Sequence, residues 1–242
     1  MSFSFPSGKR LVVMIPAYNE EASLARVIQN VREAIPFADI VVINDGSHDK
    51  TKSVGRESGA HVVNLPFNLG IGSAMQTGFL FARDNGYDFA IQVDGDGQHD
   101  PREIEVILTP LINGEADVIA GARYIEDRGY ITPLPRRVGI IILSSIISLA
   151  VRRRVTDPTS GFRASNRKAI EYCAGDYPYD YPEPESVVQF FKAGLKMREV
   201  PVTMNPRYGG QSSITPLRSF YYMVKVILAI MIDLLRDTPR IR

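Results

Sequence analysis

The stretch "DFAIQVDGDGQHDP" (residues 88–101) joins a short apolar run to a turn crowded with acidic and amide groups. The run 88–93 is almost uninterrupted by polar residues, which is typical of a parallel strand covered on both faces. Asp100 and Pro101 then fit the N-cap and the first position of a helix. This succession of strand, turn and helix favours an α/β fold.

The same succession recurs on both sides of this stretch. Short apolar runs rich in β-branched residues occupy 10–15, 39–44, 60–65 and 116–121. Segments with helical spacing separate them, and one apolar stripe consists of Leu24, Val27, Ile28 and Val31. The alternation predicts a doubly wound, Rossmann-like, mostly parallel sheet with helices on both faces and right-handed crossovers.

The rhythm changes after residue 122. A loop with proline and arginine (123–137) precedes an apolar segment (138–151), the motif "TDPTSGFR" (156–163), a helix near 185–193, a strand at 196–204 and an apolar helix at 219–236. No repeat or low-complexity linker divides the chain. We therefore expect one domain over 1–242, with a nucleotide-binding half (about 8–122), a continuous C-terminal acceptor half (about 123–215) and a final helix (about 216–236).

Composition narrows the class of protein. The 28 basic and 27 acidic residues nearly cancel, which gives no reason to expect a nucleic-acid partner. The single cysteine, Cys173, excludes an internal disulfide and suits a reducing compartment. With no histidine nearby in sequence, Cys173 is expected to be a buried structural residue rather than a nucleophile.

The long apolar segments are not convincing membrane spans. Residues 138–151 fall short of the roughly 20 residues that cross a bilayer, and Lys225 and Asp233 interrupt 219–236. The N-terminus does not read as a signal peptide. We expect a cytoplasmic protein that is soluble or peripheral at the inner face of the cell membrane. Either segment could be a core helix, an interfacial helix or a homodimer contact.

Polar residues follow each of the first four predicted strands. These ends read "PAYNEE" (16–21), "NDGSHD" (44–49), "PFNLGIG" (66–72) and "DGDGQHD" (94–100). Ligands bind at the carboxyl ends of parallel strands, so the four should meet in one crevice. Neither a G-x-G-x-x-G after the first strand nor a P-loop lysine is present, which argues against those two nucleotide sites.

A divalent cation explains the crowding of carboxylates after residue 93. Asp94 and Asp96 flank Gly95, and both could approach a hard ion such as Mg²⁺ or Mn²⁺ that prefers oxygen ligands. Gln98 and Asp100 could add outer contacts. A solvated acidic turn is the alternative, but it does not account for the neighbouring polar strand ends.

Several motifs together resemble family-2 glycosyltransferases. "IPAYNEE", "VINDGSHDKT", "NLGIGSAMQTGF", "QVDGDGQHDP", "AGARY" and "DPTSGFR" stand in that family's order and spacing over about residues 10–210. The family has the GT-A fold and uses nucleotide-diphosphate sugars. "DGDGQHDP" followed by "GARY" and "SGFR" is most similar to its polyprenyl-phosphate, dolichyl-phosphate mannose synthase-like branch.

This resemblance implies a donor site. Residues expected to contact the nucleotide or to lie close to it are Pro16, Ala17, Tyr18, Glu20, Asp45, Asn68, Gly70, Gly72, Met75 and Gln76. Asp45 would accept a hydrogen bond from a base N–H, which leaves UDP, GDP and dTDP all open. Asp94 would contact ribose and metal, Asp96 would bind the metal directly and Gln98 would support it. Taken singly, Asn19-Glu20 could be a helix cap and "NDGS" a type I turn.

Cationic side chains are expected to assist departure of the nucleoside diphosphate. Arg123 of "GARY" and Arg207 of "NPRYGGQSS" are the candidates, with a solvated arginine as the alternative for each. The branch pattern R-x-x-G-x-S-K is met at Arg207, Gly210 and Ser212. Ser213 replaces its lysine, which puts one phosphate contact in doubt.

The acceptor decides which further residues are needed. A sugar hydroxyl requires a general base, and the family's acidic pattern falls on Glu183 and Glu185 of "PEPE", although the pair could equally stabilise a helix start. A lipid phosphate is already anionic and needs no base. Its expected partners are Arg136, Arg137 and Ser212, with Ile140 and Ile141 where the branch often has a serine.

The leading interpretation is an inverting, metal-dependent transferase that moves a sugar onto a polyprenyl phosphate. The second is the same donor chemistry on a saccharide hydroxyl during cell-surface polysaccharide synthesis. A nucleotidyltransferase is disfavoured, because "PAYNEE" lacks a glycine-rich basic loop. A non-catalytic nucleotide-sugar sensor and a small membrane partner both stay open.

Overall fold

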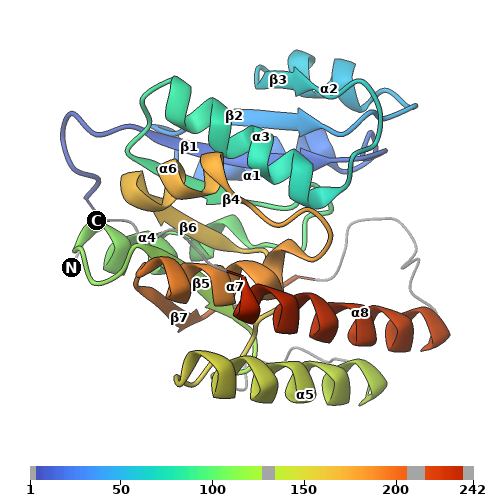
Figure 1. Ribbon diagram of the computed structural model, residues 1–242. Helices are drawn as coiled ribbons and strands as arrows, with labels where there is room; N and C mark the ends of the chain where they lie inside the picture. The colour runs from blue at the N-terminus through green and yellow to red at the C-terminus, as the bar shows by residue number, and fades with distance from the viewer. Residues whose placement is uncertain (1–3, 127–133, 206–215, 237–242) are drawn as a thin grey trace.

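The computed structural model describes residues 4–126, 134–205 and 216–236. Its centre is a sheet with the strand order β3-β2-β1-β4-β6-β5-β7 (Figure 1). The strands are β1 (Leu11–Ala17), β2 (Asp39–Asn44), β3 (His61–Asn64), β4 (Phe89–Gln92), β5 (Val118–Ala122), β6 (Arg163–Asn166) and β7 (Met197–Pro201). The helices are α1 (Leu24–Ala34), α2 (Thr51–Glu57), α3 (Ile71–Asp84), η1 (Pro101–Glu103), α4 (Ile104–Ile112), α5 (Leu134–Val151), α6 (Arg167–Gly175), α7 (Pro182–Ala193) and α8 (Pro216–Leu235).

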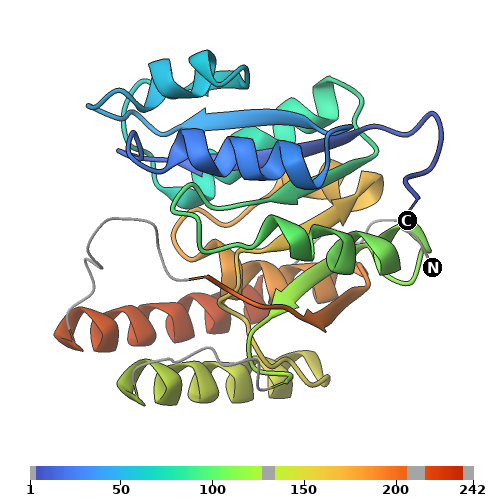
Figure 2. The same ribbon diagram turned by 180° about the vertical axis from the view of Figure 1, so that it is seen from behind.

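The sheet is covered on both faces, as the apolar runs predict. Every residue of β1 is buried, and successive side chains alternate between two cores. Val13 and Ile15 pack in the core with α1 and α4, which lie in front of the sheet in Figure 2. Val12 and Met14 face the opposite core with α3 and α6, in front in Figure 1. The predicted α/β class with helices on both faces is therefore confirmed.

Local signals place the helix ends near the turn after β4. Asp100 is the N-cap before Pro101, and its Oδ1 accepts a hydrogen bond from Arg102 N at 3.0 Å. The Arg102 side chain also binds Asp100, and this pairing lowers the pKa of the Asp100 carboxyl. Asp100 therefore caps a helix, as its position before Pro101 predicted, and its outer contact to a cation stays a prediction.

One strand was not predicted. β6 lies between β4 and β5 and is antiparallel to both, whereas every other pairing is parallel. Its sequence, "RASN", carries Arg163 and Ser165 as buried polar residues, so no apolar run marks it. The simple doubly wound picture is wrong at this point, because a strand from the second half of the chain completes the sheet.

A third, smaller core lies under α5, α7 and α8. Its buried residues are Leu143, Ile147, Val155, Val187, Val188, Val226 and Ile230. α5 and α8 lie side by side at the β7 end of the molecule in Figures 1 and 2. Among the described residues, no helix combines the length and apolar character needed to cross a bilayer.

Candidate active site

The turn after β4 lies against the end of β1. The two strands are parallel neighbours, with Met14 paired to Gln92. A Cβ built on Gly95 would lie 3.3 Å from the Pro16 carbonyl oxygen and 3.5 Å from Glu20 Cγ, so no larger residue would fit without a shift. The structure thus brings "PAYNEE" and "DGDGQHD" together at the carboxyl edge of the sheet.

Asp45 holds the loop that follows β3. Its Oδ1 accepts a hydrogen bond from Leu69 N at 2.8 Å, and its Oδ2 accepts one from Gly70 N at 3.0 Å. Gly70 has a φ of +89°, a conformation that favours glycine. Asp45 is only 4% exposed, so most of its surface is already committed to the loop. Hydrogen bonding of this carboxylate to a base stays a prediction.

The "PAYNEE" segment is also tied to the segment after β2. Glu20 N donates to Thr51 Oγ1 at 2.8 Å, and His48 N donates to Asn19 Oδ1 at 2.9 Å. Asn19 has a φ of +56°, which shows that this turn is sharply specified. Tyr18 remains exposed beside it, as a residue of a nucleotide wall would be.

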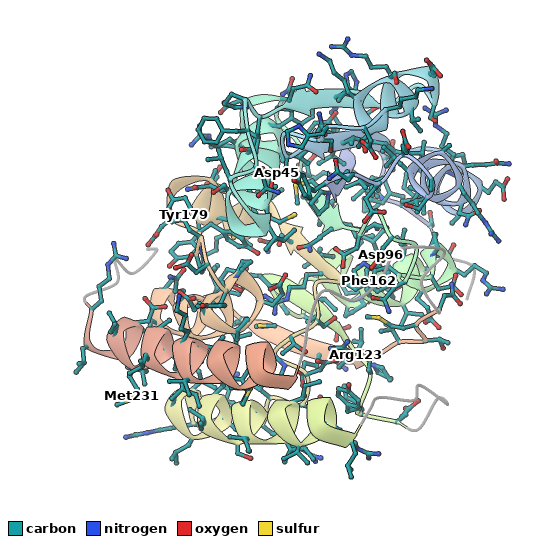
Figure 3. The ribbon with its side chains drawn as sticks, turned by 90° about the vertical axis from the view of Figure 1, so that its right-hand side faces the viewer. Asp45, Asp96, Arg123, Phe162, Tyr179 and Met231 are labelled. Carbon is teal, nitrogen blue, oxygen red and sulfur yellow. The ribbon has the colours of Figure 1, made fainter. Side chains whose placement is uncertain are left out.

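Asp94 is held from two directions. Gln92 Nε2 donates to its Oδ1 at 3.1 Å, and its backbone N–H donates to His99 Nδ1 at 3.0 Å. Its carboxylate nevertheless remains 36% exposed. Asp96, two residues on, accepts Gln98 N on Oδ1 at 2.9 Å and closes the turn (labelled in Figure 3).

These donor atoms fit a hard divalent cation. Asp94 and Asp96 offer only oxygen, the ligand that Mg²⁺ and Mn²⁺ prefer. Over the ranges that the structure describes, no group of three or more acidic, histidine or cysteine side chains could hold a metal. An ion at Asp94 and Asp96 would therefore keep most coordination positions for substrate phosphates and water, as Mg²⁺ commonly does in nucleotide enzymes.

The loop 156–163 borders Asp94. A Cβ built on Gly161 would lie 2.8 Å from Gln92 Nε2 and 3.5 Å from both carboxylate oxygens of Asp94. The next residue, Phe162, stacks on His99 with ring centroids 4.7 Å apart. The "SGF" motif is thus one wall of the candidate site.

Arg123 fixes this loop to β5. Its guanidinium binds both carboxylate oxygens of Asp157, at 2.6 and 2.7 Å, and Thr159 Oγ1 at 2.7 Å. Arg123 is 8% exposed. The structure therefore gives this arginine a loop-holding role that the sequence did not suggest, and contact with a pyrophosphate stays a prediction.

Arg163 joins the same loop to α7. Nε donates to Ser160 O, Nη1 to Ser186 Oγ and Nη2 to Glu183 O, all at 2.7–2.8 Å. The residue belongs to the "SGFR" motif but was assigned no role from sequence. Its signal was an arginine immediately after an apolar residue, Phe162, at the end of the motif "TDPTSGFR".

Glu183 and Glu185 occupy different environments, because residues two apart on a helix point to opposite sides. Burial raises the pKa of Glu183, Arg163 opposes the shift and the charge of Asp94 adds to it. Glu183 is thus within electrostatic reach of the Asp94 carboxylate. Burial, Asp233 and Asp180 raise the pKa of Glu185 to about 7. The structure brings Glu183, and not Glu185, to the candidate site.

A sequence model of glycosyl transferase family 2 matches residues 12–174, more than half of the chain. The chain belongs to glycosyl transferase family 2. It is therefore a glycosyltransferase, and the resemblance drawn from its motifs is confirmed.

Two relatives of this family-2 glycosyltransferase align along more than four fifths of their own length. A UDP-N-acetylglucosamine–dolichyl-phosphate N-acetylglucosaminyltransferase of Methanococcus voltae is 28% identical, covering 93% of this chain and 99% of the relative. A polyprenol monophosphomannose synthase of Mycolicibacterium smegmatis is 29% identical, covering 86% and 82%. Glucosyl-3-phosphoglycerate synthase from Mycobacterium tuberculosis, solved with Mn²⁺, UDP and phosphoglyceric acid, superposes with a TM-score of 0.69 at 20% identity, covering 94% and 79%. This last likeness confirms the GT-A fold.

Three residues of α3 that were expected at or near the nucleoside differ in their surroundings. Met75 is fully buried in the core, so it does not offer its side chain to the surface, and its position near the nucleoside stays a prediction. A Cβ on Gly72 would meet the carbonyl oxygens of Pro178 and Tyr179 at 2.2 and 2.3 Å, so this glycine allows α3 to approach that loop. Gln76 on α3 is half-buried.

Only some of the predicted phosphate-binding residues lie in the part of the chain that the structure describes. Arg136 and Arg137 lie in the first turn of α5, and Arg137 is exposed. Arg207 and Ser212 lie outside the described residues. Cys173 is buried in the α6 core, and burial raises the pKa of its thiol, in agreement with a structural role.

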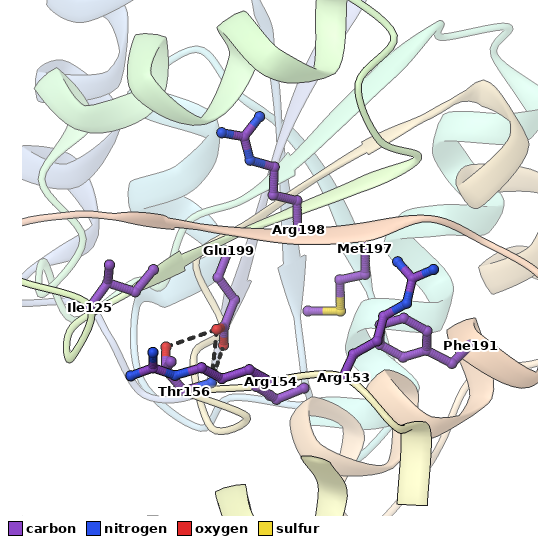
Figure 4. Close-up of a pocket in the computed structure, with 9 residues that line it drawn as sticks. Ile125, Arg153, Arg154, Thr156, Phe191, Met197, Arg198 and Glu199 are labelled. Carbon is purple, nitrogen blue, oxygen red and sulfur yellow. Dashed lines mark hydrogen bonds between the residues drawn. The ribbon is translucent and has the colours of Figure 1, made fainter. Parts of the chain in front are cut away.

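A cavity of about 350 Å³ is lined by none of the residues that follow β1, β2, β3 and β4 (Figure 4). Its lining residues are Ile125, Arg153, Arg154, Val155, Thr156, Phe191, Met197, Arg198 and Glu199. Glu199 accepts hydrogen bonds from Thr156 N and Oγ1, both at 2.8 Å, and from Asp157 N at 2.8 Å. The cavity thus adjoins the start of the loop 156–163, at Thr156, and none of the predicted site residues lines it.

Proposed function

We propose that this glycosyltransferase moves a sugar from a nucleoside diphosphate to a polyprenyl phosphate at a membrane surface. The observation that carries the proposal is the pair of relatives named for dolichyl-phosphate and polyprenol substrates, which align over more than four fifths of both chains. The Asp94–Asp96 turn at the carboxyl edge of the sheet supports it, because a nucleotide sugar needs its phosphate charge balanced there.

The donor lies along the ends of β1 and β2 in this proposal. Pro16, Ala17, Tyr18 and Glu20 contact the nucleoside, together with the loop that Asp45 holds. Asp94 and Asp96, supported by Gln98, hold Mg²⁺ or Mn²⁺. When bound, this cation acts as a Lewis acid that stabilises negative charge on the departing diphosphate.

The acceptor phosphate supplies the nucleophile. One of its oxygens attacks C1 of the sugar from the face opposite the nucleotide, a new C1–O bond forms and the old one breaks. The electron pair leaves with the nucleoside diphosphate, so the anomeric configuration inverts. No proton has to be removed, because the phosphate is already ionised. Arg136 and Arg137 of α5, with Ser212, bind the acceptor. Arg207 assists departure of the nucleoside diphosphate, and Arg123 holds the loop 156–163 beside it.

An apolar surface on α5 and α8 supports contact with a membrane. Its exposed residues, here named the α5–α8 surface, are Leu134, Val138, Ile141, Ile142 and Leu149 with Val224, Leu228, Met231, Ile232, Leu234 and Leu235 (Met231 is labelled in Figure 3). Arg137, at the start of α5, and the run Arg152, Arg153 and Arg154 at its end place positive charge beside this surface. Apolar and basic side chains together suit the surface of an anionic leaflet.

Lipid-product formation tests the proposal. UDP-N-acetylglucosamine, UDP-glucose and GDP-mannose, each labelled in the sugar, are incubated in detergent with Mn²⁺ and undecaprenyl or dolichyl phosphate. We expect label from at least one donor to enter the organic phase. Asp96→Ala should reduce this transfer by about 100-fold or more, whereas Asp84→Ala, on an exposed side chain of α3, should leave it unchanged. Transfer to saccharide acceptors alone would refute the lipid acceptor.

A further inference from the structure

His99 is a deeply buried polar side chain in the turn that follows β4. Its side chain is 3% exposed, and its ring stacks on Phe162 with an interplanar angle of 14°. Its backbone forms an isolated antiparallel bridge with Met204, beyond β7. A histidine enclosed in this way has a fixed ring plane, so the groups that its two nitrogens face are fixed as well.

Both nitrogens of His99 face Asp94. Nδ1 accepts the backbone N–H of Asp94 at 3.0 Å, so in the neutral ring the proton resides on Nε2. Nε2 in turn faces Oδ2 of the Asp94 carboxylate at 3.5 Å. On the other side, Gln92 Nε2 donates to Oδ1 at 3.1 Å. The carboxylate therefore lies between the nitrogen atoms of two buried side chains, while the Asp94 side chain remains 36% exposed.

We infer that His99 is a positioning residue, which fixes the backbone of Asp94 through Nδ1 and thereby orients the Asp94 carboxylate toward the divalent cation. The inference rests on the proposed function, because that function puts the cation at Asp94 and Asp96. His99 also transmits the position of the acceptor half to the donor site. Phe162, from the loop 156–163, stacks on the imidazole of His99, and Met204, from the segment after β7, pairs with the backbone of His99.

Three substitutions distinguish the Nδ1 and Nε2 contacts of His99 from a role in which its ring only fills space in the core. His99→Asn places Oδ1 where Nδ1 lies, so it can still accept the Asp94 N–H. His99→Gln places a polar group near the Nε2 position and leaves that N–H without its acceptor. His99→Phe keeps a flat ring against Phe162 but removes both nitrogens. A merely structural role would rank the variants by volume and ring stacking, with Phe best.

The readout is binding of Mn²⁺ in the presence of UDP, measured by isothermal titration calorimetry without any acceptor. Loss of a group that orients a metal ligand commonly weakens metal binding 10- to 100-fold. We therefore expect His99→Phe and His99→Gln to raise the Mn²⁺ Kd by about 10-fold or more, and His99→Asn to stay within about 3-fold of wild type. Thermal unfolding of each variant shows whether it is folded.

Phe162→Leu provides a second route if His99→Phe does not fold. It loosens the ring of His99 while keeping both nitrogens, and should weaken Mn²⁺ binding with a smaller effect. Wild-type affinity in His99→Phe or Phe162→Leu, equal weakening in Asn and Phe, or no Mn²⁺ binding by the wild type would each overturn the inference. Because no acceptor is present, failure to form a lipid product bears on the proposed function and leaves this measurement intact.

Discussion

Nε of Arg123 lies 2.6 Å from Oδ2 of Asp157, and Nη2 lies 2.7 Å from Oδ1, in a bidentate ion pair closed to solvent. The backbone N–H of Arg123 also donates to the same carboxylate, at 3.1 Å. The pair connects β5 to the loop 156–163 and hence to Gly161 beside Asp94. Its integrity should control both stability and the shape of the site.

Asp157→Asn should destabilise the protein by about 3–5 kcal/mol, because it removes the carboxylate charge that binds the buried Arg123 guanidinium in two places. The free energy of unfolding from urea titration measures the effect. Glu171→Gln is the control, since it breaks the exposed Arg167–Glu171 pair on α6 and should cost no more than about 0.5 kcal/mol. A loss below about 1 kcal/mol in Asp157→Asn would contradict a structural role for the pair.

Gly161→Ala should impair the metal site without unfolding the protein. The added Cβ would lie 2.8 Å from Gln92 Nε2, which then has to move away from Asp94 Oδ1. We expect Mn²⁺ affinity in the presence of UDP to fall about 10-fold. Gly175→Ala, where a Cβ meets nothing within 4 Å, is the matched control. Unchanged affinity in Gly161→Ala would show that the Gln92 contact is dispensable.

Glu183→Gln distinguishes the two acceptor classes. With a lipid phosphate, kcat should change less than about 10-fold, because no proton transfer is needed. If a sugar hydroxyl is the acceptor, loss of the base should lower kcat by about 100-fold or more while the donor still binds. Single-turnover transfer together with UDP binding measures both quantities. A large kcat loss with polyprenyl phosphate would overturn the base-free step.

Glu185 should make stability depend on pH. Its pKa is raised from 4.5 to about 7 in the fold, so the unfolded chain ionises first and stability falls as the pH rises through this interval. Because the side chain is only partly buried, solvent screening reduces the effect to on the order of 1 kcal/mol. Glu185→Gln should therefore raise Tm at pH 8 and raise it less at pH 5. The exposed Glu105→Gln is the control, and a gain that is equal at both pH values would exclude this ionisation as the cause.

The double variant Leu228→Glu, Ile232→Glu tests the α5–α8 surface. These residues are one turn apart on α8 and both are exposed. Each substitution removes about 2 kcal/mol of favourable free energy for transfer of an apolar side chain from water to the membrane interface. Partition onto anionic vesicles should therefore fall by at least about 10-fold. Val106→Glu, on the exposed side of α4, should bind vesicles as the wild type does. Light scattering gives the alternative outcome: a wild-type dimer that the double variant dissociates, with no vesicle binding by either.

The sequence predicts the donor half closely, and the reason is physical. β1, β2, β4 and β5 are buried on both faces, so each appears as an apolar run that no other environment explains as well. The turn at Asp94 is equally visible, because acidic and amide residues follow the apolar run of β4 directly. The helix start at Asp100 needed only the local dipeptide with Pro101.

The remainder depends on contacts that a linear pattern does not carry. Glu183 and Glu185 look equivalent in "PEPE", and only the orientation of α7 separates the side chain near Asp94 from the one near Asp233. From sequence, Arg123 could also be a solvated surface arginine. Only the structure shows that it is buried in an ion pair with Asp157, which is distant in sequence. β6 has no apolar signal, because its central position comes from pairing with β4 and β5.

The place of β6 has a consequence for dissecting the molecule. Residues 163–166 supply the hydrogen-bonding partners between β4 and β5, so an excised 1–122 fragment would have a seam through the middle of its sheet. Such a piece would expose two unpaired strand borders and associate with itself rather than bind nucleotides. The two halves of the chain therefore share one continuous sheet, and we expect that neither half folds without the other.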